Sequence, residues 1–381
     1  MPAFEVPAPD LPALAVVLPP REAFSAAESG AIGMLVHRLA GVAGGFDVTV
    51  LGRAVATPFA GADFHPIRPA WQLANSTMRY AAGVAGWLRR RRPALIEVHN
   101  RPDVALFLAR RFPAVTLVLH NDPQGMRRAR TPADRQHLAS RLARVVTVSE
   151  WLRGRFVEGI AAPLDIAVLP NCIDLRAIPP SPAPREKLIL FVGRVVSDKG
   201  AGAFVAACAR ALPQLPGWRA EMIGADRFGV PEHETPFLHR LRPLAAAARV
   251  AMPGWRPHDQ VLAAMARAAL VVVPSRWPEP FGLTALEAMA CGAAVLASAR
   301  GGLPEVVGDV AVTIDPDDVP GLAAAMLALA GDAERRDALG AAGRARAALF
   351  DVIPAVARMD ALRAAAASRP YIRGKAEEPV A

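Results

Sequence analysis

A chain of 381 residues is too long for one ordinary hydrophobic core, and its 53% hydrophobic content excludes a disordered protein. The net charge of +9 favours anionic partners, but aromatic residues make up only 6% of the chain and no nucleic-acid-binding motif is present, which argues against nucleic acid. No apolar stretch is long and uncharged enough to span a membrane, and the N-terminus, with Glu5 and Asp10 and no basic start, is unlike a secretory signal. We therefore expect a folded cytoplasmic protein with two domains.

The first half of the chain alternates short β-rich apolar runs with longer helical stretches. Helices are predicted within 31–40 and 71–91. The predicted strands are 14–18, 47–52, 94–100, 115–122 and 144–150. This alternation is typical of βαβ units and predicts a parallel sheet with helices on both faces.

The positive charge is concentrated in this first half. Residues 1–180 contain 21 Arg and no Lys against 14 acidic residues, a net charge of +7, and arginines cluster at 89–92 and at 127–155. Such a patch attracts phosphate-rich partners or anionic lipid head groups. The alternative is that these arginines end helices and solvate surface faces.

A Pro-rich segment with four prolines at 179–184 interrupts the alternation and predicts a stiff spacer. The same alternation then restarts, with predicted strands at 188–194, 218–224, 249–255, 269–275, 293–298 and 310–315. We predict an N-terminal domain at 1–178, a linker at 179–187, a C-terminal domain at 188–350, and a helix within 351–381 that returns to the N-terminal domain, followed by a tail.

The spacing of cysteine and histidine indicates neither a disulfide framework nor a metal site. Cys172, Cys208 and Cys291 have no CxxC spacing, and the eight histidines contain no HExxH pair. Asp315 and Asp317 form a DxD string after the last predicted strand, and we interpret them as turn and cap residues. We therefore expect buried free cysteines and no metal.

Polar residues follow the first predicted strand of the second domain, where open parallel sheets bind ligands. In "FVGRVVSDKG" (191–200), Gly193 permits close approach of a ligand to the backbone, and Arg194 offers a planar fork suited to phosphate oxygens. Lys199 is one of only three lysines in a chain with 41 arginines, which indicates a specific demand for lysine. Taken alone, the segment also fits an ordinary strand-to-helix turn with solvated charges.

A second segment, "PSRWPEPFGLTALEAMACG" (274–292), ends another strand of the same domain. A helix is predicted from Leu283, and its free N–H groups would receive an anion. Glu287 lies one turn inside this apolar helix, where burying a carboxylate costs several kcal/mol unless it accepts strong hydrogen bonds. Sugar hydroxyls are such donors. The alternative is a helix acid that points to water.

Together these segments resemble the retaining, nucleotide-sugar-dependent glycosyltransferases of family 4, which have the GT-B fold. The spacing of Glu279 and Glu287 resembles the E-x7-E motif of that family, within its "PSxxEPFGLxxLEAMAxG" frame. "FVGRVVSDKG" is similar to the family's "GRxxxxKG" segment, and "LPNCID" is similar to its "PNGVD".

The resemblance covers essentially the whole chain and is strongest in residues 164–315. It is weaker in the N-terminal half, where "ESGAIG" leaves Gly30 and Gly33 in a loop that often has adjacent glycines in the family. Cys172 also stands where the family usually has glycine. These departures affect what the resemblance implies about acceptor binding by the N-terminal loop. They do not affect what it implies about donor binding.

The resemblance implies an α/β protein with two doubly wound, Rossmann-like domains that face each other across a cleft. It implies that Arg194 and Lys199 bind the donor diphosphate in place of a metal, beside Gly193 and the amides of Phe281, Gly282 and Leu283. It also implies that Glu287 binds ribose, that Glu279 binds hydroxyls of the transferred sugar and that His120 lies near that sugar. Arg194, Lys199, Glu279 and His120 are the expected catalytic residues, and the residues of the N-terminal domain expected near the acceptor are Gly30, Gly33, His99 and Asp122.

The implied activity is a retaining, metal-independent hexosyl transfer from a nucleotide-sugar, expected to be a UDP-sugar, to a hydroxyl of a glycan or of a lipid-linked, lipopolysaccharide-type acceptor. No cofactor is expected, and the Arg-rich N-terminal domain would contact the anionic cytoplasmic face of the inner membrane. One alternative keeps the fold and makes the protein a sugar phosphorylase or a small-molecule glycosyltransferase. Another is a non-catalytic protein that binds a sugar nucleotide or a polyanion.

Overall fold

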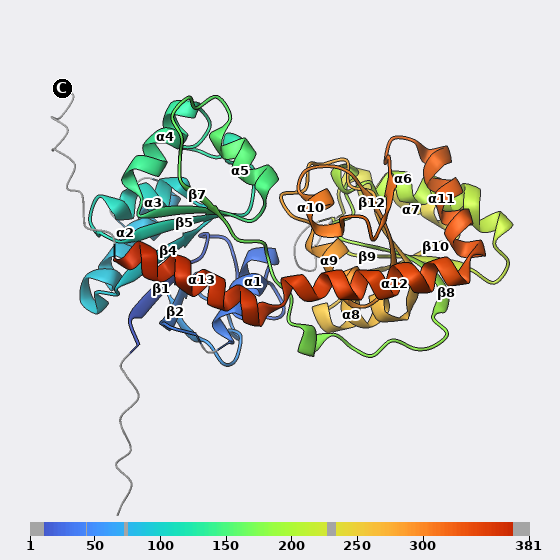
Figure 1. Cartoon of the computed structure of the whole chain (residues 1–381), viewed down its shortest axis with the longest axis horizontal. Helices are drawn as coiled ribbons and strands as arrows, with labels where there is room; N and C mark the ends of the chain where they lie inside the picture. The colour runs from blue at the N-terminus through green and yellow to red at the C-terminus, as the bar shows by residue number, and fades with distance from the viewer. Residues whose placement is uncertain (1–10, 43, 72–74, 227–233, 369–381) are drawn as a thin grey trace, which may run out of the picture.

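The computed structural model describes residues 11–42, 44–71, 75–226 and 234–368 (Figure 1). These residues form two parallel sheets, each covered by helices on both faces and set side by side along the long axis of the molecule. The first residues of the predicted N-terminal domain, part of the predicted helical stretch 71–91, and the predicted C-terminal tail lie outside the described residues. The predicted α/β architecture with two doubly wound sheets is confirmed.

The first sheet has seven strands in the order β3-β2-β1-β4-β5-β6-β7. Its strands are β1 (Ala13–Val17), β2 (Asp47–Gly52), β3 (Asp63–Pro66), β4 (Leu95–His99), β5 (Val115–Leu119), β6 (Arg144–Thr147) and β7 (Ile166–Val168). Its helices are α1 (Ala31–Ala40), α2 (Ser76–Arg91), α3 (Pro102–Ala109), α4 (Pro132–Arg141) and α5 (Glu150–Val157). The sequence did not predict β3, because this edge strand is largely exposed and has no apolar run.

The second sheet has six strands in the order β10-β9-β8-β11-β12-β13. Its strands are β8 (Glu186–Val192), β9 (Arg219–Ile223), β10 (Val250–Gly254), β11 (Ala268–Val273), β12 (Ala294–Ser298) and β13 (Val312–Ile314). Its helices are α6 (Ala201–Ala211), α7 (Pro236–Ala247), α8 (His258–Arg267), α9 (Leu283–Ala290), α10 (Leu303–Val307), α11 (Val319–Gly331) and α12 (Ala333–Ala347). Strand β8 begins two residues before the predicted start of the domain.

The strand order reverses between β1 and β4 in the first sheet and between β8 and β11 in the second. Ligands of open parallel sheets bind beyond the carboxyl ends of the strands at such switch points. Asn100 follows β4, Arg194 follows β8, and both line the same cavity. The two switch points therefore face each other.

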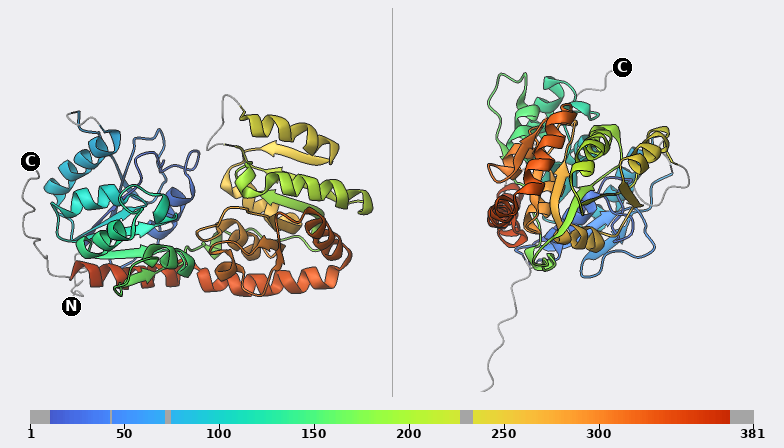
Figure 2. Two further views of the ribbon diagram at one scale, coloured as in Figure 1. Left: turned by 90° about the horizontal axis from the view of Figure 1, so that it is seen from above. Right: turned by 90° about the vertical axis from the view of Figure 1, so that its right-hand side faces the viewer.

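The last helix, α13 (Val352–Ala367), leaves the second sheet and packs on the first (Figures 1 and 2). Its residues Val352 and Val356 belong to the same buried cluster as Leu35 and Leu39 of α1. Figure 2 shows α12 and α13 in line along one side of both sheets. Among the described helices, none combines the length and apolar character needed to cross a membrane.

Candidate functional site

Two neighbouring cavities lie between the sheets. We call the one of about 540 Å³ the central cavity and the one of about 250 Å³ the adjoining cavity. The predicted residues that line the central cavity are His120, Lys199, Glu279, Phe281 and Gly282. Gly193 and Glu287 line the adjoining cavity. Gly30, Arg194 and Leu283 line both, so the structure brings these predicted residues from both sheets to one place.

Lys199 and Glu279 form an ion pair at the wall of the central cavity. The Lys199 Nζ lies 2.6 Å from Glu279 Oε1, and the hydroxyl of Ser275 donates to the same oxygen at 2.7 Å. Glu279 is buried, and Lys199 ends the short 3₁₀ turn Ser197–Lys199. The ammonium expected to bind phosphate and the carboxylate expected to bind sugar hydroxyls therefore neutralise each other in this structure.

The N-terminus of α9 supplies backbone donors to the same wall. Gly282, the residue before the helix, has φ 115°, and no side chain caps the helix there. A Cβ at this position would lie 2.5 Å from Leu303 Cδ2, so the tight turn requires glycine. The uncapped amides, with Arg194 and Lys199 beside them, make this wall suited to an anion such as a diphosphate.

Glu287 is buried in α9, and one of its carboxylate oxygens accepts two hydrogen bonds. Arg38 Nη2 of α1 lies 2.7 Å from Glu287 Oε1, and His258 Nε2 of α8 lies 2.9 Å from the same atom. Burial raises the pKa of Glu287, but the hydrogen bond from His258 and the charge of Arg38 outweigh this effect and lower the pKa to about 2. The carboxylate is therefore ionised and bound by residues from both domains.

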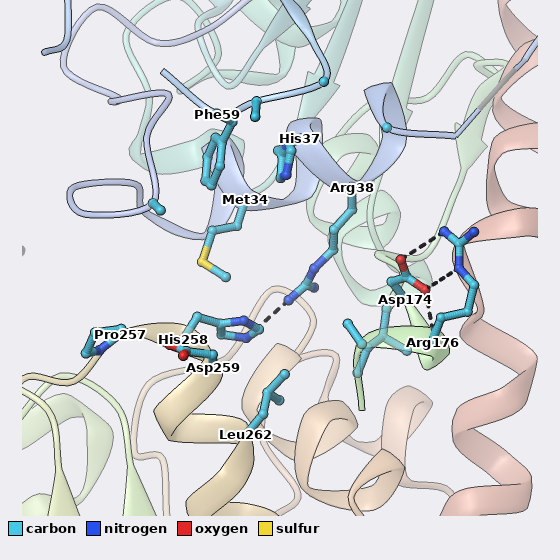
Figure 3. Close-up of a pocket in the computed structure, with 16 residues that line it drawn as sticks. Met34, His37, Arg38, Phe59, Asp174, Arg176, Pro257, His258, Asp259 and Leu262 are labelled. Atoms are coloured by element: carbon cyan, nitrogen blue, oxygen red, sulfur yellow. Dashed lines mark hydrogen bonds and ion pairs between the residues drawn. The ribbon is translucent and has the colours of Figure 1, made fainter. Parts of the chain in front are cut away.

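This arrangement corrects the expectation that a sugar must supply the donors for Glu287. The chain supplies them itself through Arg38 and His258, which lie far from Glu287 in the sequence. Arg38 also donates to the carbonyl of Cys172 at 3.1 Å, so this position, where the family usually has glycine, contributes its backbone while its side chain is buried. Figure 3 shows Arg38 reaching from α1 to His258 beside a third cavity of about 580 Å³.

Two residues predicted near the acceptor, His99 and Asp122, contact other side chains of the protein. The His99 ring is 1% exposed and lies behind His120. Asp122 accepts a hydrogen bond from the amide of Gln124 at 3.0 Å and pairs with Arg155 at 2.8 Å. Neither is among the described residues that line the central cavity, and an acceptor contact through either side chain stays a prediction.

The loop with Gly30 and Gly33 supports an acidic residue that the sequence did not single out. The amide of Gly33 donates to Glu22 Oε1 at 2.9 Å, and a Cβ on Gly33 would lie 2.5 Å from the carbonyl oxygen of Ala23. Glu22 lines the central cavity, and burial raises its pKa. Gly33 thus permits a close backbone contact that holds Glu22 at the cavity.

Contacts between the domains also fix the loop before α9. Ser149 donates to the carbonyl of Pro280 at 2.6 Å, and the carboxylate of Glu305 accepts from the amides of Glu150 and Trp151 at 2.7 and 2.6 Å. A Cβ on Gly302 would lie 2.7 Å from the Pro280 carbonyl oxygen. In the sequence, Ser149 lies at the end of the predicted strand 144–150, with no sign of its contact with Pro280 in the other domain, which is 131 residues away along the chain.

Asp315 and Asp317 shape a turn. The amide of Asp317 donates to Asp315 Oδ1 at 3.0 Å, and Asp317 pairs with Arg276 and Arg300. Within the described residues, no group of three or more His, Cys, Asp and Glu side chains could hold a metal ion. Metal-independent activity stays a prediction.

Comparisons with known proteins agree with this geometry. Residues 32–177 match a family model described as Glycosyltransferase Family 4, and residues 177–346 match one described as Glycosyl transferases group 1. A D-inositol 3-phosphate glycosyltransferase from Segniliparus rotundus is 31% identical over 71% of this chain. The match covers 61% of that relative, which is less than two thirds of its length.

Solved structures share the fold over nearly the whole chain. Sucrose-phosphate synthase from Thermosynechococcus elongatus has a TM-score of 0.77 at 20% identity, covering 92% of this chain and 98% of its own. The Anabaena protein HepE in complex with UDP-glucose has a TM-score of 0.74 at 20% identity, covering 92% and 99%. At such identities the likeness shows the fold alone.

Proposed function

The chain belongs to the family 4 glycosyltransferases and has the GT-B fold, and on this basis we propose that it transfers a sugar from a UDP-sugar to an acceptor hydroxyl with retention of configuration. The acceptor in this proposal is a glycan or a lipid-linked, lipopolysaccharide-type molecule. The observation that carries the proposal is the convergence of Arg194, Lys199 and the α9 N-terminus on one cavity, with Glu287 at the next. The UDP-glucose complex of HepE, which has the same fold, supports the choice of nucleotide.

In this proposal, fixed positive charge stabilises the departing nucleoside diphosphate. Negative charge builds on the bridging oxygen as the bond to the sugar breaks, and preorganised cations and amides lower the energy of that state. Lys199 would exchange its present partner, Glu279, for a phosphate oxygen. Glu279 would then be available to accept hydrogen bonds from hydroxyls of the transferred sugar, and the acceptor hydroxyl would attack on the face that the diphosphate leaves.

Ribose binding by Glu287 is compatible with its protein partners. Arg38 and His258 both bind Oε1. None of the hydrogen bonds found within the described residues involves Oε2, and Glu287 lines the adjoining cavity. An ionised carboxylate with one oxygen held in place is a preorganised acceptor for a ribose hydroxyl.

Membrane contact through the Arg-rich N-terminal domain is a separate part of the proposal. Arg89, Arg90 and Arg91 at the end of α2 are exposed, and Trp71 is 92% exposed. Trp87 instead packs in the core. The exposed arginines at the C-terminal end of α2 are suited to the anionic cytoplasmic face of an inner membrane, whereas Trp71 precedes the opposite end of this helix.

A thermal-shift panel of UDP, GDP, ADP and their sugar conjugates, run with EDTA, tests the donor. We expect UDP and UDP-sugars to raise the melting temperature of the wild type, because a ligand that binds only the folded state stabilises it. Lys199→Ala should lose most of this shift, whereas Lys187→Ala, which changes an exposed lysine outside the cavities, should keep it.

No shift with any nucleotide would contradict the proposal. Phosphate-dependent release of sugar from a disaccharide would instead favour a phosphorylase. Nucleotide-sugar binding without turnover for any acceptor would favour a non-catalytic binding protein.

A further inference from the structure

A continuous line of buried side chains runs from α13 through β4 to the central cavity. Arg363 of α13 donates to Glu97 of β4, Glu97 contacts His99, and His99 contacts His120, a residue that lines the central cavity. We propose that Glu97, His99 and Arg363 are positioning residues that hold His120 as a neutral ring, with its Nδ1 a hydrogen-bond acceptor toward the cavity. The identity of its partner, a hydroxyl of the transferred sugar, rests on the proposed function.

The line begins with a paired carboxylate inside the sheet. Glu97 is 1% exposed; Arg363 Nε lies 2.9 Å from its Oε2 and Arg363 Nη2 lies 3.1 Å from its Oε1. Arg363 is also buried and bonds Asp360 at 3.0 Å. Burial raises the pKa of Glu97, but the charge of Arg363 and the hydrogen bond from His99 hold it well below its usual range. Glu97 is therefore a carboxylate, which can only accept hydrogen bonds.

The proton positions follow from this acceptor. His99 Nε2 lies 2.9 Å from Glu97 Oε1, so His99 Nε2 must carry a proton. In neutral His99 the other nitrogen, Nδ1, can then only accept. Its 2.9 Å contact with His120 Nε2 therefore requires His120 Nε2 to donate. Neutral His120 has no second proton, which leaves Nδ1 as an acceptor.

The surroundings of His120 favour the neutral ring. Burial lowers its pKa well below the ordinary value for histidine and outweighs the opposite effect of the nearby Glu97 carboxylate. No hydrogen bond from His120 Nδ1 to another described residue is found, and the backbone amide of His120 is bound by Asn100 Oδ1 at 3.2 Å. The charged side chains that line the same cavity are Arg21, Glu22, Arg101, Arg194, Lys199 and Glu279. Because four of these are cations, an additional positive charge on His120 would be unfavourable.

Nitrogen-15 NMR of histidine-labelled, full-length protein tests the proposal directly. The His120 signals are identified by their loss in His120→Asn. We expect wild-type His120 at pH 7 to be neutral, with a proton on Nε2 and none on Nδ1. A cationic ring, or a proton on Nδ1, would overturn the proposal.

A double variant tests whether the buried pair sets this state. Glu97→Leu combined with Arg363→Met removes both charges together, which folded cores tolerate better than one unpaired charge. In the double variant we expect His120 to populate both neutral tautomers. In the control Arg358→Met, which changes an exposed arginine of the same helix, we expect His120 to keep its proton on Nε2 alone. An unchanged His120 tautomer in the double variant would overturn the proposal. Arg363→Lys, which retains the positive charge, is a second variant that disturbs the fold less than the double variant.

Binding and turnover of UDP and UDP-glucose provide a functional readout. UDP affinity should be the same in wild type and double variant, because His120 lies outside the adjoining cavity, whereas turnover of UDP-glucose should fall about 10- to 100-fold. Equal turnover would contradict the positioning role. If neither compound bound the wild type, the proposed function would fail, and the NMR result would still decide the state of His120.

Discussion

At the scale of single residues, the two carboxylate oxygens of Glu287 differ in their hydrogen-bond partners. Arg38 and His258 both contact Oε1, and they come from α1 and α8, so the carboxylate connects the two domains as well as lining a cavity. This double engagement explains how an acidic side chain is tolerated in an apolar helix. It also makes the carboxylate a source of pH-dependent stability.

The lowered pKa of Glu287 predicts a loss of stability in acid. The group contributes stability above about pH 4.5, and this contribution falls as the pH drops toward about 2, with a total of about 3 kcal/mol. Urea unfolding should therefore show a large difference between wild type and Glu287→Gln at pH 7 and a smaller one near pH 3. Glu334→Gln, on an exposed face of α12, should differ little from wild type at either pH. A constant difference for Glu287→Gln would contradict the assignment.

At the scale of elements, α5 and the loop before α9 form the second connection between the domains. Ser149 binds the Pro280 carbonyl from the N-cap of α5, and Glu305 caps the same helix from the second domain. The loop that presents the α9 amides to the central cavity is therefore held from the opposite domain. The position of this loop therefore depends on the contact between the two domains.

A methyl group at Gly302 should disturb this contact. In Gly302→Ala the Cβ would lie 2.7 Å from the Pro280 carbonyl oxygen and 3.1 Å from Ser149 Oγ, so the loop or α5 must move. We expect turnover to fall by at least about 10-fold and UDP affinity to weaken as well, because the displaced loop carries the α9 amides and a small displacement of reacting groups is costly in rate. Gly202→Ala in α6, where nothing lies within 4 Å of the added Cβ, is the matched control. Equal turnover in the two variants would show that the contact is not needed.

The elements also show what local sequence can predict. Apolar runs predict strands such as β1, β5 and β11, and the motifs that follow β8 and β11 point to Arg194, Lys199 and Glu279, which line one cavity in the structure. The partners of Glu287 and Glu97 were not found, because Arg38 and Arg363 are 249 and 266 residues away from them. A charged residue inside a buried strand, as in "LIEVH", indicates that a partner exists but does not identify it.

At the scale of the whole molecule, the charge is distributed unevenly between the domains. The exposed arginines at the end of α2 lie in the first domain, whose net charge exceeds that of the second. If this surface contacts lipid, its contribution is electrostatic and should weaken with salt.

Vesicle co-sedimentation checks the membrane contact. Changing Arg89, Arg90 and Arg91 together to Gln should reduce binding to vesicles containing anionic phosphatidylglycerol by about 100-fold, at about 1 kcal/mol per arginine. The control changes Arg210, Arg240 and Arg335, which are exposed on the second domain, to Gln. Wild-type binding that is equal for neutral and anionic vesicles would contradict the electrostatic contact.

The return of α13 makes the first domain discontinuous along the chain. The chain crosses between the domains twice, and the crossings are joined where the amide of Ile173 donates to the carbonyl of Phe350 at 2.9 Å and the amide of Val352 donates to the carbonyl of Ile173 at 2.8 Å. The two crossing segments are therefore tied to each other by backbone hydrogen bonds where they pass between the sheets. A fragment that ends at residue 178 would lack Arg363 and leave Glu97 buried without its cation, so the first domain depends for its folding on the last helix that the chain makes.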